Sequence, residues 1–266
     1  MQALERIGGN AMRVKDVYNL IDRYAPFAIA EEWDNAGFLM GHKDAEVTKI
    51  LVTLDADFCA MEHAVKEGCN LIISHHPFIF DTEKQITDRS GQGRKILYAL
   101  ENHLNIISAH TNLDSCEGGI NDTLAALLGL NVTEKFIPTR EGGMLGRIGT
   151  HSFASLDQFL SHAASVLNVT PRYRMVNASF KKIAVVSGSG SSCMKDALAA
   201  GVDTLVTGDC RYSAYIEAAE IGLNLIDLGH FETEQIIVPV LAEYLRSHAL
   251  TVTEHIIPTP ICTSEA

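Results

Sequence analysis

The sequence predicts an α/β protein made of two related α/β lobes. Short aliphatic runs alternate with helical patterns along the chain, glycines follow the helical patterns, and one long segment occurs twice. Such alternation is typical of folds in which a largely parallel sheet is covered by helices. The 266 residues suffice for one large domain or two smaller lobes, because a domain has roughly 150 residues.

The predicted strands are short runs rich in Ile, Val and Leu. They cover residues 49–54, 70–74, 105–108, 182–187, 204–207 and 224–228. The helical patterns between them cover residues 58–67, 94–102, 121–128, 194–200 and 212–221. Four of these helical patterns are followed by a glycine, the residue that a left-handed C-terminal cap favours, namely Gly68, Gly129, Gly201 and Gly222.

The C-terminal part of the chain predicts one long helix and a final strand. Residues 233–247 are amphipathic, and residues 251–257 form a last β-branched run. Pro239 lies within the helical pattern, so it predicts either a kink or a late start of this helix.

An internal repeat supports the two lobes. Residues 49–76 align with residues 182–209 without a gap, and residues 104–114 align with residues 223–234 when one residue is skipped. Because both matches occur in the same order, we expect a duplicated unit. We assign residues 12–130 and 236–266 to the first lobe and residues 131–235 to the second.

Composition and charge exclude several classes of protein. No apolar run approaches the roughly 20 residues of a membrane span, and the first residues lack the apolar core of a signal peptide. We therefore expect a soluble, cytoplasmic protein. The 21 Lys and Arg residues against 33 Asp and Glu residues give a net charge of −12, which disfavours nucleic-acid binding. The six cysteines include no Cys-x-x-Cys pair and are expected to be free thiols.

Histidines and acidic residues follow three of the predicted strands. They are His75 and His76 after residues 70–74, His110 and Asp114 after residues 105–108, and His230 and Glu234 after residues 224–228. Ligands of open α/β sheets lie in the crevice beyond the carboxyl ends of the strands. Imidazole and carboxylate together suit Zn, Fe, Mn or Ni rather than Mg or Ca. The strand ends therefore predict a metal site in this crevice.

Each of these motifs has a simpler interpretation when taken alone. Two histidines at a strand end can cap a loop, a His-x-x-x-Glu pair is common on solvated helices, and Asp114 can belong to an Asx turn or helix cap. Their combination on three strand ends favours a metal site. A tetrahedral zinc ion takes only four ligands, and five such side chains exceed that number. We therefore expect two divalent metal ions about 3.5–4 Å apart that share a carboxylate.

Three further segments carry weaker signals. Residues 187–192 form a Ser/Gly run that could bind phosphate through backbone amides, although a tight turn is favoured. Asp209 aligns with His76 in the repeat and could face the crevice, and Trp33, Asp34 and Asn35 predict a packed turn. Covalent catalysis is disfavoured, because no serine lies in a nucleophile elbow and no cysteine has a nearby histidine.

Four motifs occur together in this chain: SHHPFIF at residues 74–80, AHTNLDSCEGGINDTLAALLGL at 109–130, VDTLVTGD at 202–209 and GHFETE at 229–234. In combination they resemble the GTP cyclohydrolase 1 type 2 homolog family, a dinuclear-metal, NIF-three-like group. Residues 12–41 are similar to the family's N-terminus, and the chain is similar to the short form without an inserted middle domain. Residues 1–11 fall outside the resemblance and are interpreted as a tag, a leader or an alternative start.

The resemblance implies two lobes and a ring-shaped homohexamer with a two-metal site inside the ring. Carried over by position, the implied ligands are His75, His76, Asp114, His230 and Glu234, with Glu234 bridging. His110 would lie beside the site, as an outer residue or an acid/base group. The family name implies hydrolytic opening of the imidazole ring of GTP, so a nucleotide is the expected small-molecule substrate. A metal-binding scaffold or metal chaperone that acts through protein partners is the alternative.

Overall fold

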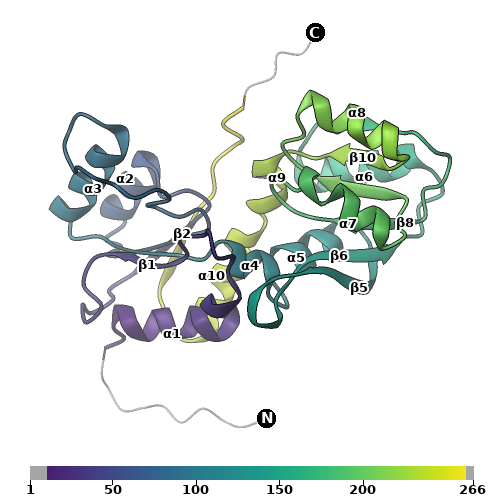
Figure 1. The fold of residues 1–266 in the computed structure, drawn as a ribbon. Helices are drawn as coiled ribbons and strands as arrows, with labels where there is room; N and C mark the ends of the chain where they lie inside the picture. Colours follow the sequence, from purple (N-terminus) through teal and green to yellow (C-terminus); the bar gives the residue numbers. More distant parts are fainter. Residues whose placement is uncertain (1–10, 262–266) are drawn as a thin grey trace.

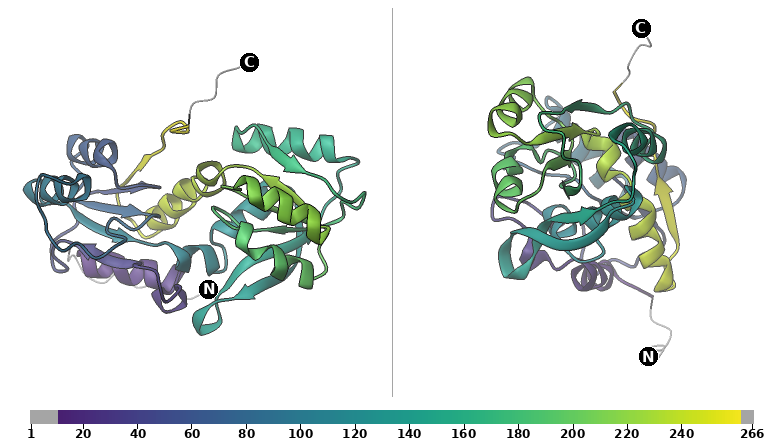
Figure 2. Two further views of the ribbon diagram at one scale, coloured as in Figure 1. Left: turned by 45° about the horizontal axis from the view of Figure 1, so that its top comes forward. Right: turned by 90° about the vertical axis from the view of Figure 1, so that its right-hand side faces the viewer.

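The computed structural model describes residues 11–261, which form two lobes with one β-sheet each (Figure 1). The two lobes lie side by side, and the chain between β10 and β11 crosses from the second lobe back to the first (Figure 2). This arrangement confirms the predicted α/β class and its two lobes. The expectations for residues 1–10 and for Cys262 lie outside the described residues.

The first lobe contains a five-stranded sheet in the order β1-β4-β3-β2-β11. Strands β11, β2, β3 and β4 run parallel, and β1 pairs antiparallel with β4. The strands are β1 (Gly37–Met40), β2 (Ile50–Thr53), β3 (Leu71–Ser74), β4 (Asn105–Ser108) and β11 (Val252–His255). The helices that cover this sheet are α1 (Val14–Tyr24), α2 (Phe58–Lys66), α3 (Gly91–Glu101) and α10 (Ile237–Ser247).

The second lobe contains a six-stranded sheet in the order β5-β6-β8-β9-β10-β7. Strands β8, β9 and β10 run parallel, whereas β5, β6 and β7 pair antiparallel with their neighbours. The strands are β5 (Asn131–Pro138), β6 (Met144–Thr150), β7 (Arg172–Arg174), β8 (Lys182–Val185), β9 (Thr204–Thr207) and β10 (Asn224–Asp227). The helices of this lobe are α6 (Leu156–Leu167), α7 (Met194–Ala199) and α8 (Tyr212–Ile221).

Three further helices lie where the lobes meet: α4 (Thr111–Ser115), α5 (Ile120–Leu127) and α9 (His230–Glu234). Helices α4 and α5 both contact β6 of the second sheet, and α5 also contacts α9. Short 3₁₀ helices occur at η1 (Phe27–Ile29), η2 (Arg140–Gly142) and η3 (Ser191–Cys193).

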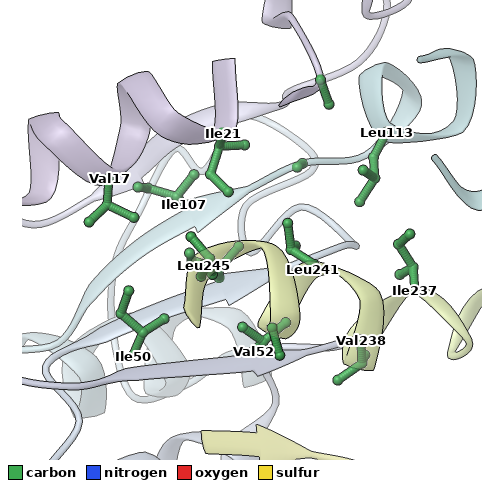
Figure 3. Packing of buried hydrophobic residues seen from close by; sticks show 14 of the residues in the cluster. Val17, Ile21, Ile50, Val52, Ile107, Leu113, Ile237, Val238, Leu241 and Leu245 are labelled. Carbon is green, nitrogen blue, oxygen red and sulfur yellow. The ribbon is translucent and has the colours of Figure 1, made fainter. Parts of the chain in front are cut away.

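A buried hydrophobic cluster holds α1 and α10 on one face of the first sheet (Figure 3). Ile21 of α1, Leu241 of α10 and Ile107 of β4 are almost fully buried in it. Burial of one such side chain contributes about 1.5–3 kcal/mol to stability. The same cluster includes Leu113 of α4 and Phe231 of α9. The core therefore anchors the two short helices that carry the candidate site residues.

The internal repeat corresponds to the same local topology in both lobes. Strands β2, β3 and β4 lie side by side in parallel, and β8, β9 and β10 do the same in the second sheet. The connection between the first two strands of each set contains a helix, α2 or α7. The third strand of each set is followed by a five-residue helix, α4 or α9. The two copies thus present equivalent strand ends toward the boundary between the lobes.

All seven predicted strands are present, and the structure adds four others. Strand β5 is exposed at most positions and β6 contains two glycines and an arginine, so neither shows the aliphatic run that marked the central strands. Strands β1 and β7 are short edge elements with few buried positions. Helices α1 and α6 also were not predicted. Pro239 lies in the first turn of α10, where its missing amide hydrogen costs no helical bond, so the late start is confirmed.

Within residues 11–261, no helix is long and apolar enough to cross a membrane. The five cysteines of this range are free thiols, as expected.

Candidate metal centre

The predicted site residues meet between the carboxyl ends of the two parallel strand sets. His75 and His76 directly follow β3 of the first sheet. His110 caps the N-terminus of α4, and Asp114 lies within that helix. His230 and Glu234 are the first and last residues of α9, so one helical turn places them on the same side. The crevice therefore lies between two sheets rather than along a single one.

Glu234 is the centre of this cluster. Its Oε2 lies 2.9 Å from His76 Nε2, 3.0 Å from His230 Nε2 and 3.6 Å from His75 Nε2. Asp114 Oδ1 lies 3.9 Å from His75 Nε2. The Glu234 and Asp114 side chains are buried, so their charges must be balanced by groups within the site.

The other nitrogen of each imidazole ring is held by an oxygen acceptor. His75 Nδ1 donates to the carbonyl oxygen of Ala109 at 2.9 Å. The remaining rings donate from Nδ1 to carboxylates at 2.7–2.8 Å, His76 to Asp55, His110 to Asp34 and His230 to Asp209. Carbonyl and carboxylate oxygens only accept, so they hold a proton on Nδ1 of each ring, and Nε2 is the nitrogen that remains for the site. This is the arrangement of histidines that bind a metal through Nε2.

The inward-facing nitrogens fit a cation. His75 Nε2 is buried and has no hydrogen-bond partner among the described residues. His76 Nε2 and His230 Nε2 lie only 3.3 Å apart. With both Nδ1 atoms protonated, the two Nε2 lone pairs repel each other unless a proton or a metal ion lies between them. Imidazole nitrogen and carboxylate oxygen are the donors that Zn, Fe, Mn and Ni accept.

Three groups of side chains have ligand atoms within 4.8 Å of one another. One contains His76, His230 and Glu234, a second contains His75, Asp114 and Glu234, and a third contains His75, His76 and His110. The first two groups share Glu234. A carboxylate that belongs to two ligand groups can bridge two metal ions.

The pKa values show that the cluster attracts positive charge. Burial opposes protonation of His76, but hydrogen bonds to Asp55 and Glu234 raise its pKa to about 10. The hydrogen bond with Glu234 is the main reason why the pKa of His230 is raised to about 9. Burial also opposes ionisation of Glu234, yet the charge of His75 and the histidine hydrogen bonds hold its pKa well below the usual value. Burial raises the pKa of Asp114.

Two acids that orient the histidines were not predicted. Asp34 lies in the turn expected to be packed, and its buried carboxylate accepts hydrogen bonds from His110 Nδ1 and from the Thr111 amide and hydroxyl groups. In the same turn, however, Trp33 is 63% exposed, so the expectation of a packed side chain was wrong for this residue. Asp55 follows β2 closely, so the strand-end criterion that found the histidines could have found it.

The Ser/Gly run at residues 187–192 lies against Glu234, and three of its amides have side-chain partners. The amides of Ser187, Gly188 and Gly190 donate to side chains of Asn121, Thr233 and Thr207, so they are not available to an anion. Gly188 has φ +61°, and a β-carbon there would lie 2.0 Å from Glu234 Oε1. These contacts favour the interpretation of the run as a tight turn. Asp209, the other weaker prediction, faces the crevice through its contact with His230.

A cavity of about 510 Å³ opens onto this cluster. His76, His110, Asp114, His230 and Glu234 lie on its wall. Small molecules therefore can reach the centre from the space between the lobes.

Comparison with known proteins identifies relatives over almost the whole chain. The profile of the family described as Duf34/NIF3 (NGG1p interacting factor 3) matches residues 12–260. A protein of Clostridium perfringens named GTP cyclohydrolase 1 type 2 homolog is 37% identical, over 84% of this chain and 87% of its own length. A protein of the same name from Methanocaldococcus jannaschii is 34% identical over 89% of this chain and 96% of its own.

Solved structures share the fold. A Staphylococcus aureus hypothetical protein superposes with a TM-score of 0.86 at 28% identity, covering 96% of this chain and 100% of its own. Reduced HcgD from Methanocaldococcus jannaschii superposes with a TM-score of 0.80 at 31% identity, covering 91% of this chain and 97% of its own.

Proposed function

Since the chain belongs to the Duf34/NIF3 family, we propose that it is a hydrolase that depends on two divalent metal ions bound at the Glu234 cluster. The observation that carries this proposal is the convergence of three Nε2 atoms on one buried carboxylate, with His75 Nε2 lacking a hydrogen-bond partner among the described residues. Zn, Fe, Mn and Ni are the candidate metals, because the donors are nitrogen and oxygen.

The ligands divide into two sets in this proposal. His76 and His230 would hold one ion, His75 and Asp114 would hold the other, and Glu234 would bridge them. The two ligand groups that share Glu234 support this division. Divalent ions held there would supply Lewis-acid activation of water, which lowers the pKa of bound water to about 7.

His110 is the proposed acid/base group. A ring nitrogen of His110 lies in one ligand group with His75 and His76, so it is close enough to exchange a proton with water in the site. Asp34 accepts from His110 Nδ1 at 2.8 Å, which orients the ring. Burial opposes ionisation of Asp34, but the hydrogen bond from His110 lowers its pKa, so the carboxylate stays charged at neutral pH.

The first test combines metal content with turnover. Protein purified without an affinity tag should hold about two metal equivalents per chain, measured by plasma mass spectrometry. GTP is the first substrate to test, because relatives carry the name GTP cyclohydrolase 1 type 2 homolog. Ring-opened product would support GTP hydrolysis. No such product with any of the four metals would contradict GTP as the substrate without contradicting the metal site.

The alternative of a metal-binding scaffold or chaperone makes a different prediction. A hydrolase should keep its assembly and lose activity in Glu234→Ala. A scaffold should bind metal with no turnover to lose, and Glu234→Ala should instead weaken its binding to a protein partner. We further propose that the protein is a cytoplasmic homohexamer, as the family resemblance implies. Light scattering after size-exclusion chromatography would test this assembly, and a monomer at micromolar concentration would contradict it.

A further inference from the structure

Two large aromatic side chains stand exposed beside the metal-binding cluster. Trp33 is 63% exposed and Phe80 is 53% exposed, although both are strongly apolar. Their ring centroids lie 6.2 Å apart, and each lies close to the His110 ring, at 6.1 Å and 6.3 Å. Both line the cavity of about 510 Å³. Exposed apolar surface at the wall of a cavity is typical of a ligand-binding site.

Hydrogen bonds hold the backbone segments that carry these two rings. Asn35 Nδ2 donates to the carbonyl oxygen of Ile79 at 2.6 Å, which joins the turn of Trp33 to the segment of Phe80. Asp34, between Trp33 and Asn35, is bonded to His110 and Thr111. The hydrogen bonds that orient His110 therefore also fix the segment that presents Trp33. A preorganised aromatic surface loses little conformational freedom when a ligand binds.

The opposite wall comes from the second lobe and is mostly apolar. Leu145, Val186 and Cys193 line it, with the exposed hydroxyl-bearing residues Ser189 and Ser192 at its edge. No Lys or Arg side chain lines the cavity among residues 11–261. A ligand group with several negative charges would therefore find neither a lysine nor an arginine on the described walls of this cavity. A flat, uncharged ring fits the aromatic wall, and the hydroxyl groups can bond to its polar substituents.

We infer that the substrate carries a planar aromatic or heteroaromatic ring that binds against Trp33 and Phe80, without phosphate groups on the ring side. The group to be hydrolysed then lies over His110 and Glu234. This inference rests on the proposed hydrolase function for its chemistry, whereas the ring-binding site stands on the cavity alone. Of the parts of GTP, the guanine ring has a counterpart in the aromatic wall, whereas no described Lys or Arg lines the cavity to pair with the triphosphate.

The test uses two probes that share a metal-chelating group and differ in the ring. Benzohydroxamic acid carries a phenyl ring, and acetohydroxamic acid carries a methyl group in its place. Isothermal titration of metal-loaded protein should give at least tenfold tighter binding of the benzo compound. Trp33→Ala and Phe80→Ala should each remove most of this difference and leave acetohydroxamic acid unchanged. Tyr212→Ala is the control, because Tyr212 is 82% exposed and lies outside the cavity lining.

Trp33 also provides a direct signal, since it is the one tryptophan of the chain. Its fluorescence should be quenched by benzohydroxamic acid and not by acetohydroxamic acid. Benzamide lacks the chelating group, so quenching by benzamide that weakens in Phe80→Ala supports the ring site even if no metal is held. Equal affinity for both hydroxamic acids, with no quenching by benzamide, would overturn the inference and leave the metal site intact. Loss of all metal binding would contradict the proposed function instead.

Discussion

Glu234 is the carboxylate on which three imidazole nitrogens of the cluster converge. It is buried, and its Oε2 lies within 3.6 Å of three imidazole nitrogens. The amide of glutamine has the same shape without the charge, so Glu234→Gln isolates the electrostatic contribution. Because a bridging ligand belongs to both sites, we expect this variant to lose at least half of its bound metal.

Metal content after dialysis, measured by plasma mass spectrometry, checks this expectation. Glu232→Gln is the matched control, since Glu232 lies on the same helix and belongs to none of the ligand groups. Retention of two equivalents in Glu234→Gln would rule out the bridging role.

The acids that accept hydrogen bonds from histidine Nδ1 atoms also contribute as single residues. Asp55 Oδ1 accepts from His76 Nδ1 at 2.8 Å and so fixes the ring with Nε2 toward Glu234. Removal of such an acceptor typically lowers metal affinity by about 10–100-fold. Asp55→Ala should therefore weaken metal binding in competition with a chelator of known affinity. Asp81→Ala, which changes an exposed acid of the same lobe, should leave the affinity unchanged. Equal affinities in the two variants would contradict an orienting role of Asp55.

At the scale of elements, the turn after β8 determines where α9 and its glutamate can lie. Gly188 has φ +61°, and a β-carbon added there would lie 2.0 Å from Glu234 Oε1. Gly201 has φ +70°, and a β-carbon added there would meet no atom within 4 Å. Alanine at either position should destabilise the folded protein by a similar amount, about 1–2 kcal/mol, because its β-carbon disfavours the left-handed backbone conformation. Gly188→Ala should lose additional stability and also lose metal, because Glu234 must move.

Urea denaturation and metal analysis of Gly188→Ala and Gly201→Ala make this comparison. The difference between the two variants measures the contact with Glu234, since the backbone strain is common to both. Identical metal content would show that Glu234 tolerates the displacement.

At the scale of the whole molecule, an ion pair between the buried Arg147 and the partly buried Asp122 links α5 to the second sheet. Arg147 of β6 is fully buried and donates to both carboxylate oxygens of Asp122, to the carbonyl oxygen of Cys116 and to that of Met144. Removal of one partner of such a pair costs about 3–5 kcal/mol, because the remaining charge is buried without compensation. Asp122→Asn should therefore strongly lower the free energy of unfolding.

This contribution should depend on pH. Burial opposes ionisation of Asp122, but the hydrogen bond and charge of Arg147 lower its pKa. A lowered folded-state pKa stabilises the protein above the unfolded-state pKa and loses this effect as pH falls through the folded-state value. The stability of wild type and Asp122→Asn should thus differ at pH 7 and converge under acid conditions. Glu101→Gln, at an exposed position, serves as control, and a difference independent of pH would contradict an ionic contribution.

We propose that the chain passes from one lobe to the other after residues 130 and 235. Limited proteolysis followed by mass spectrometry would test these boundaries, since flexible junctions are cut before folded lobes.

The sequence by itself determined the parallel strands and the residues that follow them. Strands such as β3 and β4 are buried at every position, so an unbroken aliphatic run marks them locally. Strand β5 is exposed at most positions and carries no such run, so it became visible only through its pairing with β6. His75, His76 and Glu234 could be grouped because a strand end has a fixed place in an α/β sheet.

Only the tertiary structure decided how these residues act together. Asp34 holds His110 across 76 residues of sequence, and no local pattern records that hydrogen bond. The turn of residues 33–35 was expected to be packed, but Trp33 is 63% exposed and lines the cavity. An aliphatic strand pattern is local, whereas side-chain orientation within a site depends on partners that the fold brings from distant parts of the chain.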